Sequence, residues 1–117
     1  MRMDVEFNFC CAHLLPNYDG ICSRHHGHHY RMMISVAGTP DPHTGMIIDF
    51  EEVRQVVTDR VLSLVDHRYL NDIPGLENPT AEHMVVLFWG RLKDVLPGLC
   101  EIRLWETPEY SIVYNGD

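Results

Sequence analysis

The stretch GICSRHHGHHY, residues 20–30, gathers one thiol and four imidazoles within eight positions. Imidazole nitrogens and thiolates are the ligands that Zn²⁺ prefers, and a catalytic zinc site commonly keeps three protein ligands and one open position. His26 and His28 lie two residues apart, so a strand would place both side chains on one face. Gly27 reduces crowding between them. The spacing therefore indicates a metal site.

A third histidine, His13, ends an earlier alternating segment. In MDVEFNFCCAH, apolar side chains take the odd positions and polar side chains most of the even ones, which is the period of a half-buried strand. If this strand pairs with the one that carries His26 and His28, three imidazoles meet at the end of one apolar face. We favour a specific metal site of these three residues over a solvent-facing histidine run with incidental metal affinity.

Cys22 precedes these histidines and has three interpretations. It is a fourth zinc ligand that closes a structural site, a base or nucleophile whose thiolate performs chemistry, or a loop thiol without a role. Spacing alone does not separate them. The remaining histidines fit other places: we expect His25, His29 and His43 at the surface or beside the site, and His83 in the first turn of a helix.

Carboxylates at two places add further chemistry. Asp66 and His67 are adjacent in an expected loop, where the carboxylate can orient or tune the imidazole for proton transfer. The alternative is a polar pair that ends a helix. Glu106 shares a strand phase with Ile102 and Leu104, so its carboxylate follows an apolar face. A buried carboxylate needs partners, which a planar ligand with paired N–H donors or a structural arginine would supply.

The elements that must position these residues follow from periodicity and caps. Strands are predicted over residues 3–13, 26–36, 100–106 and 110–116, and amphipathic helices over residues 50–64 and 80–97. Asp49 and Thr80 are the expected N-caps. This order predicts an α+β fold with a four-stranded antiparallel sheet and two helices on one face, in the order ββααββ. The open edges of such a sheet favour an oligomer.

Composition sets the broad class. The 117 residues predict one domain over 1–117, and 45% hydrophobic with 22% charged residues is typical of a globular protein. A net charge of −8 argues against a nucleic-acid partner. The N-terminal stretch carries acids and no long apolar run, so we expect no signal peptide and no membrane span. The cysteine spacing favours reduced thiols, and hence a cytoplasmic protein.

Five longer segments occur in order along nearly the whole chain: FNFCCAH, CSRHHGH, DPHTGMIIDF, VDHRYLNDIPGLENPTAE and LWETPEYSIVY. Together they resemble the family of 6-pyruvoyltetrahydropterin and 6-carboxytetrahydropterin synthases. The C-x-x-x-HGH spacing, DPHTG and YLNDIPGLENPT resemble the 6-carboxy branch, which serves the synthesis of queuosine and related deazapurines. The resemblance implies a tunnelling fold, in which two trimers form a homohexamer, sheets join into barrels and active sites lie between subunits.

The resemblance also implies a role for each motif residue. The zinc ligands would be His13, His26 and His28, and the catalytic thiol would be Cys22. The proton-transfer pair would be Asp66 and His67, and the pterin anchor would be Glu106. The implied reaction converts 7,8-dihydroneopterin triphosphate to 6-carboxy-5,6,7,8-tetrahydropterin, acetaldehyde and triphosphate. Two alternatives stay open: a 6-pyruvoyltetrahydropterin synthase, which keeps the three-carbon side chain, and a noncatalytic metal- or pterin-binding protein in which Cys22 closes a Cys-His₃ site.

The chain departs from the family pattern at two positions. Relatives commonly carry a basic residue before the thiol and an arginine after the first zinc histidine, where this chain has Ile21 and Leu14. Recognition of a triphosphate would then fall to Arg24 or to basic groups of another subunit.

Overall fold

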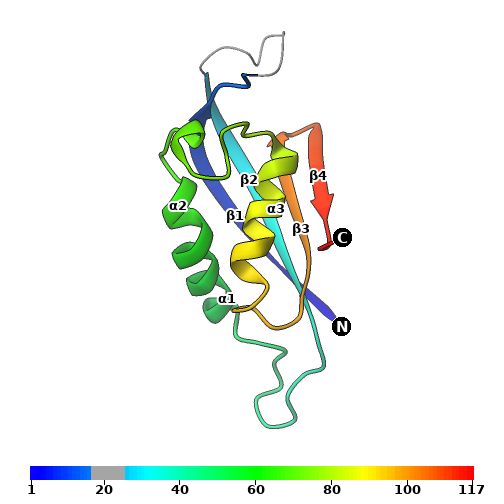
Figure 1. Cartoon of the computed structure of the whole chain (residues 1–117). Helices are drawn as coiled ribbons and strands as arrows, with labels where there is room; N and C mark the ends of the chain where they lie inside the picture. The colour runs from blue at the N-terminus through cyan, green and yellow to red at the C-terminus, as the bar shows by residue number, and fades with distance from the viewer. Residues whose placement is uncertain (17–25) are drawn as a thin grey trace.

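A single antiparallel sheet of four strands carries two helical segments on one face (Figure 1). The computed structural model describes residues 1–16 and 26–117. The strands, in chain order and in sheet order, are β1 (Arg2–His13), β2 (His26–Ala37), β3 (Leu99–Thr107) and β4 (Tyr110–Tyr114). The helical elements are α1 (Phe50–Val57), η2 (Thr58–Leu62), α2 (Ser63–Val65), η3 (Leu70–Asp72) and α3 (Ala81–Leu92). The predicted α+β class and ββααββ order are confirmed.

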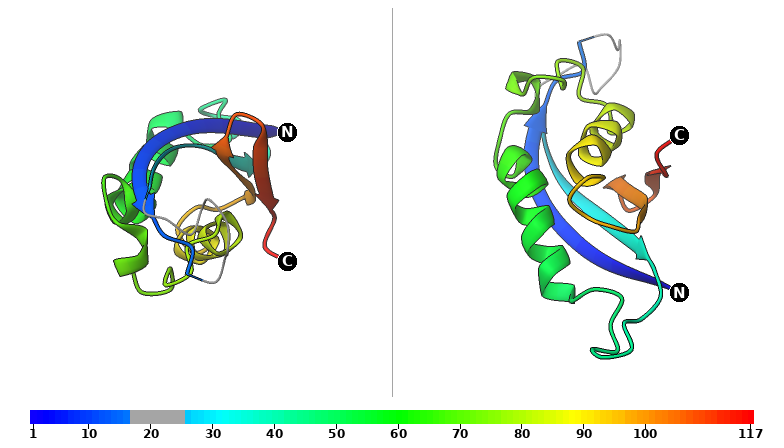
Figure 2. Two further views of the ribbon diagram at one scale, coloured as in Figure 1. Left: turned by 90° about the horizontal axis from the view of Figure 1, so that it is seen from above. Right: turned by 60° about the horizontal axis from the view of Figure 1, so that its bottom comes forward.

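Strand alternation gives the sheet one apolar face. On β1, the odd residues from Val5 to His13 are at most 6% exposed, whereas the even residues from Arg2 to Cys10 are exposed. On β2, Tyr30, Met32 and Ile34 are fully buried on the same face. Seen from above, the strands follow an arc with α3 on its concave side (Figure 2). The apolar core therefore lies between the sheet and the helices, and the opposite face is polar.

The first helical segment runs without a break through α1, η2 and α2, and η2 is a π-helical turn. Its fully buried side chains are Val53, Val57, Val61 and Val65. Each four-residue step overshoots a 3.6-residue turn by roughly 40°, so an unbroken α-helix would rotate this row off the sheet. The wider π turn brings it back, which explains an irregularity that the sequence pattern did not predict. Asp49 caps the segment as predicted, accepting from the N–H of Glu51 at 2.9 Å.

The second helix, α3, begins after Thr80, whose hydroxyl accepts from the N–H of His83 at 3.2 Å. This confirms the predicted cap and the place of His83 in the first turn. The helix ends at Leu92, earlier than the predicted end at residue 97. Residues 93–98 form turns in which Leu96 remains fully buried, so the apolar spacing continues after the helix has ended. Among the described residues, no helix is long and apolar enough to cross a membrane.

Gly98 closes the connection from α3 to β3 and supplies a first test of the fold. Its φ is +85°, and an added Cβ would clash with the carbonyl oxygen of Ala37. We expect Gly98→Ala to lower the free energy of unfolding by about 1–3 kcal/mol, because strain and overpacking act together. Gly90, exposed on α3 with open space around it, is the matched control. Gly90→Ala should stabilise by about 0.5–1 kcal/mol.

Denaturant unfolding followed by circular dichroism measures both variants. Equal stability of Gly98→Ala and the parent would contradict the close approach of Gly98 to Ala37.

Candidate functional site

The register of β1 and β2 brings the predicted histidines to one end of the sheet. His13 pairs with His26 across the two strands, and Cys11 pairs with His28. His13 is 1% exposed and the imidazole of His28 is 15% exposed. Their ring centroids are 4.5 Å apart. The backbone of His26 lies at the predicted position in the strand, opposite His13. Its side chain lies outside the described part of the structure.

A carboxylate from β3 joins the two described imidazoles. Oε1 of Glu106 is 3.7 Å from Nε2 of His13 and 3.4 Å from Nε2 of His28. One ligand atom from each of the three residues lies within 4.8 Å of the others, which is compact enough to hold a metal ion. The pairing of β3 with β4 shifts between Trp105 and Thr107, and such irregularities re-aim side chains beside active sites.

The donor set fits Zn²⁺. Imidazole nitrogens and a carboxylate oxygen are zinc ligands, and two or three of them from a rigid sheet leave room for further ligands. Sequence reasoning placed Glu106 at the end of the apolar face but did not predict its approach to the histidines. The signal was the strand phase it shares with Leu104, which is fully buried.

Tyr30 contacts the site from the buried side of the sheet. The sequence pattern did not lead us to predict a functional role for it. Its hydroxyl lies 3.0 Å from Nδ1 of His13, in a fully buried position. The Tyr30 ring stacks on Phe9 with centroids 5.2 Å apart, and Phe9 meets Phe88 of α3 edge-on. Metal-binding histidines typically use their second nitrogen in this way, which fixes the ring and its tautomer. A tyrosine in phase with His26 and His28 was the available signal, because a buried hydroxyl needs a partner.

The predicted proton-transfer pair is in contact. Nδ1 of His67 lies 2.9 Å from Oδ1 of Asp66. The same Asp66 oxygen accepts from the N–H of Cys10 at 3.1 Å, and the N–H of His67 donates to the carbonyl of Cys10 at 2.6 Å. The loop thus lies along the outer edge of β1. Asp66 is also the C-cap of α2, so the pair ends a helix, as the alternative stated, and contacts β1 as well.

Two further contacts hold that loop on β1. The N–H of Ala12 donates to the carbonyl of Arg68 at 3.1 Å. The side-chain amide of Asn71 both accepts from the N–H of Leu14 at 2.8 Å and donates to its carbonyl at 2.7 Å. The backbone of His67 has a φ of +60°, which non-glycine residues seldom adopt. Such strain clusters at functional sites.

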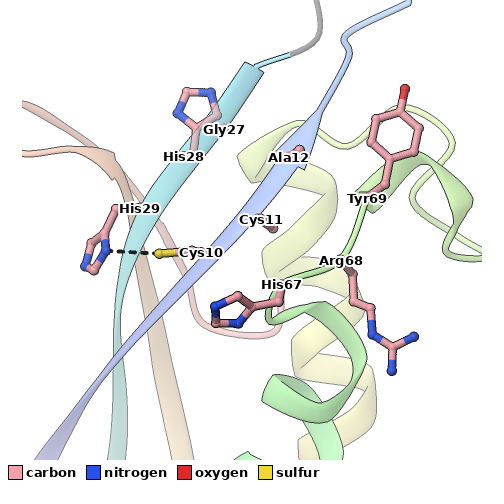
Figure 3. A pocket seen from close by; sticks show the side chains of 9 residues that line it. All are labelled: Cys10, Cys11, Ala12, Gly27, His28, His29, His67, Arg68 and Tyr69. Atoms are coloured by element: carbon pink, nitrogen blue, oxygen red, sulfur yellow. Dashed lines mark hydrogen bonds between the residues drawn. The ribbon is translucent and has the colours of Figure 1, made fainter.

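Two cavities border these groups. One of about 610 Å³ is lined by Cys10, His28 and His67, among others (Figure 3). A smaller one of about 170 Å³ lies beside Glu106, between β3, β4 and the start of α3. Glu82 and Ser111 add polar groups to its wall.

The other predicted residues have mixed outcomes. Cys22 and His25 lie outside the described residues, as do Ile21 and Arg24. His43 is exposed, as expected. His29 contacts two side chains on the polar face of the sheet, Cys10 and Asn8.

Comparison with known proteins extends these observations. The family model described as 6-pyruvoyl tetrahydropterin synthase matches residues 2–117. The 6-carboxy-5,6,7,8-tetrahydropterin synthase of Synechocystis is 38% identical and is matched over 87% of this chain and 83% of its own. The human 6-pyruvoyl tetrahydrobiopterin synthase is 31% identical over 79% of this chain and 67% of its own.

A solved structure agrees over the full chain. The Caenorhabditis elegans 6-pyruvoyl tetrahydropterin synthase has a TM-score of 0.91 and 27% identity, covering 100% of this chain and 96% of that one. The tunnelling fold is therefore confirmed. With a family match across the sheet, both helices and the histidine end of the strands, the chain belongs to the 6-pyruvoyl tetrahydropterin synthase family.

Proposed function

We propose that the chain converts 7,8-dihydroneopterin triphosphate to 6-carboxy-5,6,7,8-tetrahydropterin, with release of acetaldehyde and triphosphate. It would be a carbon–oxygen and carbon–carbon lyase in queuosine or deazapurine synthesis. The observation that carries the proposal is the donor cluster of His13, His28 and Glu106, found in a chain 38% identical to a 6-carboxytetrahydropterin synthase. The Haemophilus influenzae protein of that name is 30% identical over 97% of this chain, which supports the same branch.

We assign the zinc site to His13, His26 and His28. When bound there, zinc would supply a Lewis acid for charge that develops on the side-chain oxygens of the substrate. If Nε2 of His13 holds the metal, Nδ1 would carry the proton and would donate to the Tyr30 hydroxyl, which lies 3.0 Å away. This bond would fix the ring before the substrate arrives.

Proton transfer falls to Cys22, Asp66 and His67 in this proposal. Cys22 would remove a proton from a side-chain carbon, and His67 would exchange the complementary proton as unsaturation moves between side chain and ring. Asp66 would orient His67 through the 2.9 Å contact at Nδ1, so that Nε2 faces the reaction. The imidazole of His67 is 80% exposed, which leaves it accessible to a substrate or to a neighbouring subunit.

Glu106 would hold the pterin ring. A carboxylate pairs well with the adjacent amino and ring N–H donors of a pterin. The cavity of about 170 Å³ beside Glu106 is below the roughly 300–1,000 Å³ of sites that enclose a whole drug-sized ligand, so it would hold the ring and leave the triphosphate outside. The carboxylate would then lie between the ring and the imidazoles.

We further propose a cytoplasmic homohexamer formed as a dimer of trimers. β1 and β4 are the outer strands of the sheet, and pairing between subunits would cover their edges. Basic groups from a neighbouring subunit would then be available to the triphosphate, since Leu14 stands where relatives carry an arginine. No nucleic acid or membrane partner is part of this proposal.

One other product has direct support. The human relative, 31% identical, is named a 6-pyruvoyl tetrahydrobiopterin synthase, and the corresponding product would keep the three-carbon side chain. The same donor cluster would serve either reaction, so product analysis separates them.

Mass spectrometry of the products is the direct test. Zinc-loaded protein incubated with 7,8-dihydroneopterin triphosphate should give 6-carboxytetrahydropterin and acetaldehyde. Cys22→Ala should form neither above background, because the proton acceptor is lost. A 6-pyruvoyl product would assign the protein to the other branch. Unchanged substrate with a folded, zinc-filled protein would contradict the synthase proposal.

Glu106→Gln separates ring anchoring from metal binding. We expect kcat/KM to fall roughly 10- to 150-fold, since a hydrogen bond to a charged group contributes about 1.5–3 kcal/mol. Zinc content, measured by atomic emission, should stay that of the parent. Glu109→Gln, an exposed acid in the turn before β4, is the matched control and should change neither quantity. Loss of zinc in Glu106→Gln would instead make Glu106 a metal ligand.

His67→Gly tests whether strain is stored at the proton-transfer residue. Glycine relieves the left-handed backbone, worth roughly 1–2 kcal/mol, at an entropic cost of about 0.4–1 kcal/mol. We therefore expect stability equal to or slightly above that of the parent, with activity lost. Arg68→Gly, at a position with negative φ, should lose stability instead. Denaturant unfolding and the product assay together decide, and a large loss of stability in His67→Gly would contradict the interpretation.

A further inference from the structure

The polar face of the sheet carries a second cluster of reactive side chains. Sγ of Cys10 lies 3.4 Å from Nδ1 of His29, directly across the β1–β2 pair, as the dashed line in Figure 3 shows. Nε2 of His29 lies 3.1 Å from Oδ1 of Asn8. The three side chains form a continuous chain of contacts: thiol, imidazole and amide. They point away from the buried face that carries His13 and Tyr30.

The side-chain amide of Asn8 determines which nitrogen of the His29 imidazole donates and which accepts. An amide oxygen only accepts, so in this orientation of Asn8 the Nε2 that faces Oδ1 is the donor. Nδ1 is then the acceptor and faces the thiol of Cys10, whose S–H can donate to it. A nucleophile held by a base that a third group orients is the arrangement by which nucleophilic sites are recognised, and Cys-His-Asn is one of its known forms.

The environment singles out Cys10 among the described thiols. Burial is the main cause that raises the pKa of Cys11 to about 12, so that thiol stays neutral and inert. Sγ of Cys100 donates to the backbone carbonyl of Ser35 at 3.4 Å and is half-buried. Cys10 is exposed and has an imidazole as its partner.

Access and position also favour Cys10. It lines the cavity of about 610 Å³, which is open to solvent, so a small molecule can reach the thiol. Its backbone is held on both sides, by Asp66 at the N–H and by His67 at the carbonyl. The thiol is therefore presented from a fixed strand rather than from a loose loop.

We propose that Cys10, His29 and Asn8 form a covalent modification site for small α,β-unsaturated carbonyl compounds. Sγ bonds to the β-carbon while its proton passes to Nδ1 of His29. The carbon–carbon π electrons move toward the carbonyl, and the proton on His29 is delivered to the α-carbon. The product is a saturated thioether, with all atoms of both reactants retained and no oxidant or leaving group required. The reaction uses none of the residues assigned to the pterin reaction, although His28 and His67 line the same cavity.

Acrylamide is the probe, and adduct formation is followed by mass spectrometry. No lysine or arginine lies between Arg2 and Arg24, so trypsin leaves Cys10, Cys11 and Cys22 on one peptide. The experiment therefore uses the full chain with Cys22→Ala, and fragment ions separate the two remaining cysteines of that peptide. We expect Cys10 to react before Cys100 and to react faster in the folded protein than in the same chain unfolded in urea.

Variants assign the roles. His29→Gln in the same background should slow modification of Cys10 by roughly 100-fold or more, as expected when a positioned base is lost. Asn8→Ala should slow it less, because the imidazole remains but is no longer oriented. His43→Gln removes an exposed histidine elsewhere and should leave the rate unchanged. Circular dichroism confirms that each variant is folded.

Equal rates for Cys10 in the parent and in folded His29→Gln would overturn the proposal. If His29→Gln fails to fold, the comparison with the urea-unfolded chain still decides: a folded rate no higher than the unfolded rate would overturn it as well.

Discussion

The antiparallel register of β1 and β2 is the constraint on which both reactive sites depend. Because His13 pairs with His26 and Cys10 pairs with His29, one alignment sets the chemistry on the two faces of the sheet. A slip of one residue would turn every side chain of a strand to the opposite face. The imidazole of His13 would then leave the apolar side, and the thiol of Cys10 would enter it.

Several interactions hold that register. Phe9 and Tyr30 pair across the strands and their rings stack with centroids 5.2 Å apart, which favours this alignment. The Tyr30 hydroxyl then reaches His13, which gives a buried polar group its partner. Along the outer edge, the loop at residues 66–71 bonds to Cys10, Ala12 and Leu14. The positions of the site residues on β1 and β2 thus follow from the packing of the core.

The fold could be predicted from the sequence because its signals are local. Alternation marked β1 and β2, and Asp49 and Thr80 marked the helix starts, since a cap is read within a few residues. The histidine cluster could also be predicted, because His13 and His28 share the phase of their strands. The contacts of Glu106 with His13 and His28 could not, because they join residues more than 70 positions apart in the chain. The π-helical turn η2 could not be predicted either. It depends on which face of the helix packs against the sheet, and the helix spacing alone does not define that face.

Cys10 and Cys11 show why residue type is a weak guide to reactivity. They are neighbours in sequence, and the pleat of β1 sends their thiols to opposite faces of one sheet. Cys11 enters the core, where burial suppresses ionisation. Cys10 faces a cavity and an imidazole that Asn8 orients. Because the two thiols share one backbone segment, the difference between them arises from the face each occupies, and the same β1–β2 register that assembles His13 and His28 on one side assembles Cys10 and His29 on the other.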